Sequence, residues 1–159
     1  MVRALVELTH FYVKEMVQKK HGFIINVSST ACFQPLPYSS VYSAAKAFVS
    51  AFTEALWMET QGTNVRVLAF CPGLTKTDFG LKAGHRDFHK SLWAEKPGAV
   101  VEAAFKALRK NSPIVISGWR NRILVFLERL IPHRLLLFLL PFVQTIRKRN
   151  ENLTNIMES

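Results

Sequence analysis

The apolar residues of this chain follow two patterns that alternate along most of its length. Between residues 2 and 20 they recur at every third or fourth position, as Leu5, Leu8 and Tyr12 illustrate, which is the period of an amphipathic helix. The run Phe23–Val27 is short and rich in β-branched side chains, which is typical of a buried strand in a parallel sheet. Read in this way, the sequence predicts, in order, helix 2–20, strand 23–27, loop 28–38, helix 40–61, strand 65–70, loop 74–97, helix 97–110 and strand 113–117.

Turn-forming residues separate these elements. Gly22 and Gly62 follow two of the predicted helices, and Pro97 stands at the start of the third, which are positions that glycine and proline favour. Ser39 or Ser40 is suited to cap the helix that begins at residue 40. Alternating helices and strands indicate an α/β fold, in which a parallel sheet is covered by helices on its faces.

Residues 118–159 form a tail that is both apolar and basic. Between residues 119 and 150 there are seven Arg or Lys residues and one acid, which contribute much of the formal charge of +10. The apolar run Leu135–Val143 is shorter than the about 20 residues that a membrane-spanning helix needs. Apolar side chains flanked by Arg and Lys suit a helix that lies on a membrane surface, so one interpretation is a peripheral contact through residues 119–149. The alternative is that the tail packs over a substrate cleft or against a second subunit.

The composition indicates a globular protein of a reducing compartment. The chain is 49% hydrophobic and 20% charged, as folded domains are, and its first 20 residues show no signal peptide, so we expect a cytoplasmic location. Cys32 and Cys71 lack the spacing of a metal or redox motif, and we interpret them as free thiols. His85 and His89 have no third ligand, and few aromatic residues accompany the basic ones, so we expect neither a metal site nor nucleic-acid binding.

Tyr42 and Lys46 are four residues apart on the helix predicted over 40–61, so their side chains lie on one face with Cβ atoms about 5–6 Å apart. A lysine cation there favours the ionised form of the tyrosine, which makes the tyrosine usable as a general acid or base. Ser29 precedes Tyr42 by thirteen residues, just past a predicted strand. Because open α/β sheets bind ligands outside the carboxyl ends of their strands, the Ser29 hydroxyl can hydrogen-bond a carbonyl or alcohol. Each feature alone is weak evidence, whereas their combined order and spacing is specific.

Three segments of the chain occur in an order and at a spacing that are typical of one enzyme family. The segments are Asn26-Val27-Ser28-Ser29, Tyr42-Ser43-Ala44-Ala45-Lys46 and Cys71-Pro72-Gly73-Leu74-Thr75-Lys76-Thr77. In these segments the chain resembles the classical short-chain dehydrogenase/reductase family over residues 1–117. The resemblance implies the C-terminal, catalytic part of a Rossmann-like doubly wound parallel sheet, followed by the helical tail over 118–159.

The resemblance also implies a role for each of these residues. It assigns Ser29 to orienting the substrate oxygen, Tyr42 to transferring the proton and Lys46 to assisting the tyrosine, with NAD or NADP as the hydride carrier. The cofactor-binding residues that it implies are Tyr42, Lys46, Pro72, Gly73, Thr75 and Thr77. The apolar side chains of the loop over 74–97, among them Phe79, favour a hydrophobic alcohol or carbonyl compound as substrate.

Two features of the family do not occur in this sequence. The seven glycines are scattered, so the glycine-rich turn that binds pyrophosphate is not found. A fourth catalytic residue, an asparagine, would fall at Met1 when Thr9 and Met16 are matched to the family. We therefore expect a chain that begins within the domain, and two hypotheses stay open. One is an NAD(P)-dependent alcohol/carbonyl oxidoreductase. The other is a non-catalytic remnant that acts as a homodimer through helices 2–20 and 40–61, or through membrane contact of its tail.

Overall fold

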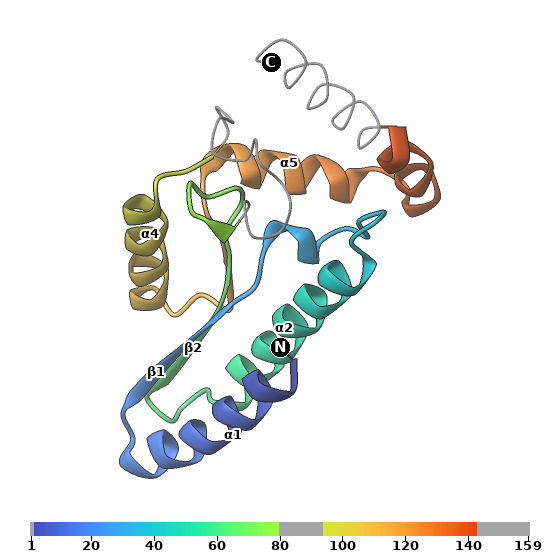
Figure 1. Cartoon of the computed structure of the whole chain (residues 1–159). Coiled ribbons are helices and arrows are strands. Elements are labelled where there is room, and N and C mark those ends of the chain that lie inside the picture. The colour runs from blue at the N-terminus through green and yellow to red at the C-terminus, as the bar shows by residue number, and fades with distance from the viewer. Residues whose placement is uncertain (1, 80–93, 143–159) are drawn as a thin grey trace.

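The computed structural model of the chain describes residues 2–79 and 94–142 (Figure 1). It confirms the predicted order of helices and strands, with limits that shift by one or two residues. The elements are α1 (Val2–Lys19), β1 (Gly22–Val27), the 3-10 turn η1 (Thr30–Cys32), α2 (Ser40–Glu59), β2 (Val65–Cys71), α4 (Pro97–Arg109), β3 (Ile114–Ile116) and α5 (Trp119–Leu130). Met1, the histidine pair of the predicted loop and the tail beyond residue 142 lie outside the described residues.

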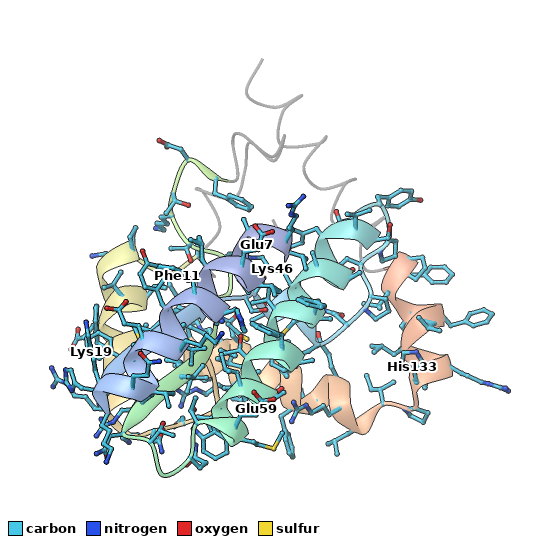
Figure 2. All side chains as sticks on the ribbon, turned by 90° about the horizontal axis from the view of Figure 1, so that it is seen from below. Glu7, Phe11, Lys19, Lys46, Glu59 and His133 are labelled. Atoms are coloured by element: carbon cyan, nitrogen blue, oxygen red, sulfur yellow. The ribbon has the colours of Figure 1, made fainter. Side chains whose placement is uncertain are left out.

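The three strands form a parallel sheet in the order β1-β2-β3. The register between β1 and β2 runs from Gly22 opposite Val65 to Val27 opposite Phe70. Helices α1 and α2 lie side by side on one face of the sheet, and α4 covers the other (Figures 1 and 2). This arrangement confirms the predicted α/β fold and explains the apolar strands, because a parallel sheet is covered on both faces.

The central strand β2 supplies the core on both faces of the sheet. Successive side chains of a strand point to opposite faces, so Leu68 and Phe70 pack toward α4, and Val65 and Val67 pack toward α1 and α2. The α4 side of the core contains Val100, Ala104, Ala107 and Leu108. The opposite side contains Leu56, Trp57, Val13 and Met16. The sheet edge that carries the candidate site is thus built on the best-buried strand of the described chain.

A buried polar contact joins α1, β1 and α2 within this core. Asn26 Nδ2 donates to Thr53 Oγ1 over 3.0 Å, and Thr9 Oγ1 donates to Asn26 Oδ1 over 3.4 Å. All three side chains are buried. Because buried polar groups need partners, this contact constrains how both helices sit on the strand.

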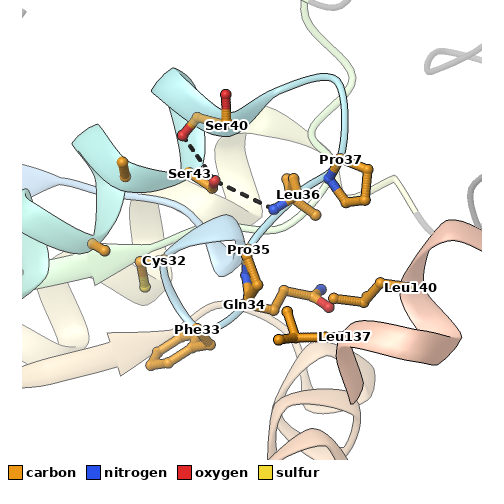
Figure 3. A pocket seen from close by; sticks show the side chains of 12 residues that line it. Cys32, Phe33, Gln34, Pro35, Leu36, Pro37, Ser40, Ser43, Leu137 and Leu140 are labelled. Atoms are coloured by element: carbon orange, nitrogen blue, oxygen red, sulfur yellow. Dashed lines mark hydrogen bonds between the residues drawn. The ribbon is translucent and has the colours of Figure 1, made fainter. Parts of the chain in front are cut away.

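The segment between β1 and α2 is more ordered than the predicted loop, because η1 interrupts it. Ser39 occupies the N-cap position of α2, but its side chain makes no capping hydrogen bond. The Ser43 hydroxyl stabilises this end instead, accepting from Leu36 N over 3.3 Å and donating to Ser40 O over 3.1 Å (Figure 3). The cap prediction was therefore correct in position and wrong in mechanism.

The described part of the tail forms α5 and a second helical segment over residues 133–142. Val125, Leu136 and Leu140 are buried, whereas most other large apolar side chains of the two segments are exposed. Among the described residues, no helix has both the length and the apolarity to cross a membrane.

Candidate active site

The candidate site lies where β1 and β2 end. Two main-chain hydrogen bonds extend their pairing beyond the strands: Ser28 N donates to Phe70 O over 2.7 Å, and Thr30 N donates to Pro72 O over 3.0 Å. The segment that contains Ser29 is therefore held beside the turn that follows β2. This is the edge at which open parallel sheets bind ligands.

Ser29 caps the turn η1. Its backbone is extended, and its Oγ accepts a hydrogen bond from Ala31 N over 3.2 Å. A hydroxyl can donate one hydrogen, and within residues 2–79 and 94–142 the Ser29 hydroxyl donates to no other group. Because Ser29 is partly exposed, its hydroxyl can donate to an oxygen of a bound molecule.

Helix α2 presents Tyr42 and Lys46 to the end of β1. The Lys46 Nζ lies 5.8 Å from the centroid of the Tyr42 ring and donates a 2.9 Å hydrogen bond to Val27 O. Burial lowers the pKa of Lys46 from its ordinary value of 10.5, because desolvation disfavours the charged form. An ammonium has three donors, so this anchoring bond leaves others for a ligand. The structure thus brings Tyr42 and Lys46 together, beside the strand that leads into Ser29.

Two serine hydroxyls fix α2 against this edge, and the sequence reading singled out neither. Ser28 Oγ donates to Lys46 O over 2.8 Å, and Ser50 Oγ donates to Ser28 Oγ over 2.9 Å. Both serines are buried. Ser50 stands four residues after Lys46, and that spacing on one helix face is the signal that could have revealed it.

The turn after β2 carries the other predicted cofactor residues. Thr75 Oγ1 donates to Gly73 O over 3.2 Å, so its hydroxyl is used within the turn. An isolated parallel bridge joins Thr75 to Glu95, with main-chain hydrogen bonds of 2.8 and 3.0 Å. Thr77 is exposed, and its N–H donates to Thr75 O over 2.8 Å. Thr77 is therefore the threonine whose hydroxyl can face a ligand.

A glutamate that the sequence reading missed ties this turn to the tail. The Glu95 carboxylate accepts hydrogen bonds from Ser117 Oγ over 2.7 Å and from Asn121 Nδ2 over 3.0 Å. The Asn121 amide also packs onto Gly73, where an added Cβ would overlap it. A glycine lets another group approach the backbone closely, and at Gly73 the group that does so is the Asn121 side chain of α5.

An apolar cavity of about 530 Å³ opens beside the site (Figure 3). It lies between the segment after η1, the first turns of α2 and the helical segment over 133–142, and its lining residues are Cys32, Phe33, Gln34, Pro35, Leu36, Pro37, Ser40, Ser43, Ala44, Ala47, Leu137 and Leu140. Neither Ser29, Tyr42 nor Lys46 lines it. The cavity therefore adjoins these three candidate residues but is not lined by them. A second apolar group is Phe79, whose ring centroid lies 6.4 Å from that of Tyr42.

Cys32 and Cys71, which are free thiols as predicted, lie in contact near the carboxyl ends of β1 and β2. Their Sγ atoms are 3.7 Å apart. Spacing along the chain gives no sign of this contact, because it depends on the parallel pairing of β1 with β2. The described residues contain no group of three or more His, Cys, Asp or Glu side chains that could hold a metal ion.

The fold and the site together define a Rossmann-like α/β protein with a neighbouring tyrosine and lysine at the carboxyl edge of its sheet. A model described as short chain dehydrogenase matches residues 1–87, more than half of the chain. The chain belongs to the short-chain dehydrogenase family.

Individual relatives agree with this assignment. A 7beta-hydroxysteroid dehydrogenase of Mediterraneibacter gnavus is 36% identical over 116 residues, which are 71% of this chain and 44% of the relative. Sulfoacetaldehyde reductase 2 of Chromohalobacter salexigens is 41% identical over 81 residues, which are 50% of this chain and 32% of the relative. The chain thus spans less than half the length of these relatives.

Solved structures share the fold. A 7beta-hydroxysteroid dehydrogenase structure has a TM-score of 0.70 and 31% identity, and the match covers 79% of this chain and 49% of the other. A short-chain dehydrogenase from Sphingobium yanoikuyae in complex with NADPH has a TM-score of 0.68 and 27% identity, with 74% and 46% covered.

Proposed function

We propose that this chain is the catalytic part of an NAD(P)-dependent oxidoreductase that interconverts an alcohol and a ketone or aldehyde. The observation that carries the proposal is the position of Lys46, whose Nζ lies 5.8 Å from the Tyr42 ring while it is anchored to the end of β1. A cation held beside a phenol favours its ionised form. The pair therefore has the chemistry of a general acid and base.

Each of the three residues takes a separate step in the proposed reaction. Tyr42 donates its phenol proton to the oxygen of a carbonyl substrate, or accepts a proton from an alcohol in the reverse direction. Ser29 donates its free hydroxyl hydrogen to the same oxygen and so orients the substrate. Lys46 stabilises the tyrosinate that remains after the proton has left, since its ammonium is held nearby.

NAD or NADP is the cofactor implied by this chemistry, and when bound it supplies or accepts the hydride. Tyr42, Lys46 and the turn that follows β2 fit this group, because they lie at the ligand-binding edge of the sheet and are partly exposed. In that turn Pro72, Gly73 and Thr75 would contact it through their backbone, and Thr77 through its hydroxyl. The NADPH and NADP+ complexes among the structural relatives support a nicotinamide cofactor.

A hydrophobic substrate is the class that the surroundings of the site favour. The Phe79 ring contacts Tyr42, and the neighbouring cavity is lined mainly by apolar side chains. Relatives named 7beta-hydroxysteroid dehydrogenase support a bulky, apolar alcohol or ketone. We therefore expect steroid-like, fatty or aromatic carbonyl compounds to be better substrates than small polar ones.

The test is the Tyr42→Phe variant, assayed by NAD(P)H absorbance with a panel of apolar ketones. Removing a general acid costs about 10²–10⁴-fold in rate, so we expect turnover to fall by at least about 100-fold. Tyr12→Phe is the matched control, because Tyr12 is an exposed tyrosine of α1. Equal turnover of wild type and Tyr42→Phe would remove Tyr42 from the mechanism.

A second proposal concerns the surface of the tail. Trp119, Phe126 and Phe138 are 67%, 62% and 76% exposed, and Arg120 and Arg134 lie on the same two helical segments. Exposed aromatic and basic side chains suit the interface of an anionic membrane, such as the cytoplasmic leaflet. We expect the chain to sediment with phosphatidylserine vesicles but not with neutral ones. The double variant that combines Trp119→Ser with Phe138→Ser should no longer sediment with the phosphatidylserine vesicles. Equal binding to both vesicle types would count against it.

An alternative to membrane binding is that the chain forms a homodimer through exposed apolar side chains on the outer faces of α1 and α2. Leu8 and Phe11 of α1 are 58% and 66% exposed, and Phe48 of α2 is 43% exposed. Figure 2 shows Phe11 on the outer side of α1, away from the sheet. A dimer that buries this face would be disrupted by Phe11→Glu, measured as a loss of mass in light scattering.

A further inference from the structure

The two cysteines of the chain, which are 39 positions apart, meet near the carboxyl ends of β1 and β2. Cys32 is the last residue of η1, and Cys71 is the last residue of β2. Their sulfur atoms are 3.7 Å apart. A disulfide needs about 2.05 Å between the sulfurs, so only a small movement separates the two states.

The backbone holds both residues where this contact can form. The hydrogen bonds from Ser28 N to Phe70 O and from Thr30 N to Pro72 O fix the two segments side by side. Cys71 belongs to the best-buried strand, whereas Cys32 closes a single 3-10 turn. The turn is therefore the part that can move toward its partner.

The two thiols differ in access. Cys71 is fully buried, whereas Cys32 is partly exposed and lines the apolar cavity (Figure 3). A small oxidant that enters the cavity can reach the sulfur of Cys32. It can reach Cys71 only through Cys32, so the geometry assigns different roles to the two residues.

The ionisation of the pair agrees with these roles. The hydrogen bond from Cys71 lowers the pKa of Cys32 to about 6, against the opposing effect of burial. The pKa of Cys71 is raised, because it keeps the hydrogen that it donates to Cys32 and because it is buried. Since the thiolate is the nucleophile in cysteine chemistry, Cys32 is the member of the pair that reacts first.

We propose that Cys32 and Cys71 are a redox-active pair that forms a reversible intramolecular disulfide when the chain meets a hydroperoxide. The Cys32 thiolate attacks one peroxide oxygen, the O–O bond breaks, and Cys32 becomes a sulfenic acid while the other oxygen leaves as hydroxide and takes up a proton. The Cys71 sulfur then attacks the Cys32 sulfur, loses its proton and displaces the sulfenic oxygen as water. The thiols together lose two electrons and two protons, and hydrogen peroxide is reduced to two molecules of water.

The disulfide has a consequence for the candidate site, which rests on the proposed function. Cys32 is three residues after Ser29, and Cys71 directly precedes Pro72. Closing the sulfur contact draws η1 toward β2 and displaces the Ser29 hydroxyl that the turn now holds. We expect the oxidised chain to lose turnover and dithiothreitol to restore it.

The test of the pair itself does not use activity. The reduced full chain is treated with hydrogen peroxide, quenched with N-ethylmaleimide and measured by intact mass. We expect the loss of both maleimide adducts and of two hydrogen atoms per monomer, at least about tenfold faster in the folded chain than in guanidinium because the thiols are held close. Two labelled thiols, a disulfide between chains, or a rate no higher than in guanidinium would overturn the proposal.

Two single variants assign the order of events. In Cys71→Ser we expect dimedone, a sulfenic-acid reagent, to label Cys32, because no second thiol is left to resolve the intermediate. In Cys32→Ser we expect no label on Cys71, because that thiol is buried. Labelling of Cys71 alone would reverse the roles and so contradict the proposal, and the wild-type measurement stands even if a variant does not fold. If the disulfide forms but the reduced chain has no turnover either, the proposed oxidoreductase function is refuted and the redox pair stands.

Discussion

The buried contact between Asn26 and Thr53 permits a quantitative test of how α2 is held on the sheet. Asn26 is 6% exposed and Thr53 is fully buried, and the Asn26 Nδ2 donates to the Thr53 Oγ1 over 3.0 Å. In Thr53→Val the hydroxyl is replaced by a methyl group of similar size, and a buried amide hydrogen loses its acceptor. Leaving such a group without a partner costs about 1–3 kcal/mol.

Replacing the other member of the contact, Asn26, affects the hydroxyls of Thr53 and Thr9. In Asn26→Leu the Thr53 hydroxyl still donates to Val49 O over 2.6 Å, and the Thr9 hydroxyl loses only a long contact of 3.4 Å. Because the Thr53 hydroxyl keeps a partner, we expect this change to cost about 0.5–1.5 kcal/mol, the net value of a hydrogen bond. When both members are replaced by apolar groups, neither leaves the other unpaired, so the double variant should be less destabilised than the sum of the singles by about 1–2 kcal/mol.

The assay is urea unfolding followed by circular dichroism, with thermal melts as a second measure. For a chain of this size, each kcal/mol shifts Tm by about 2–4 °C. Thr60→Val is the matched control, because Thr60 is also buried but its hydroxyl donates to the main-chain oxygens of Leu56 and Trp57. The effects of Thr60→Val and Asn26→Leu on the free energy of unfolding should add in the double variant. Additivity within about 0.5 kcal/mol for Asn26 and Thr53 as well would show that their contact does not hold α2 to β1.

Two further predictions concern the tail. Burial raises the pKa of the Glu128 carboxyl above its ordinary 4.5, so the folded state binds this proton more tightly and stability falls as pH rises through the raised pKa. Glu128→Gln should therefore be more stable than wild type at neutral pH and gain little below about pH 4. Urea unfolding at both pH values measures this gain, and a larger gain at the low pH would contradict the prediction. Gly118→Ala places a Cβ 2.7 Å from Glu95 Oε1 at φ +73° and should cost about 1–3 kcal/mol. Gly98→Ala, where an added Cβ meets nothing within 4 Å, should cost none, and equal Tm values for the two variants would contradict the strain.

Local pattern by itself determined the order of elements and the proximity of Tyr42 to Lys46. Helical spacing and short β-branched runs depend on which side chains face a core, and that property is written along the chain. Tyr42 and Lys46 share one helix, so their proximity follows from a spacing of four residues. The tyrosine-lysine contact could therefore be predicted, and the structure places the Lys46 ammonium near the Tyr42 ring.

Only the tertiary structure decided which distant residues meet. The contact between Cys32 and Cys71 requires the parallel register of β1 and β2, which no local pattern specifies. The hydrogen bonds of Glu95 to Ser117 and Asn121 join the turn after β2 to the tail, although Glu95 resembles an ordinary surface acid in the sequence. Strand pairing and helix packing are fixed by the sum of many weak contacts over the whole chain. Which distant residues become neighbours therefore cannot be deduced from the local sequence around either of them.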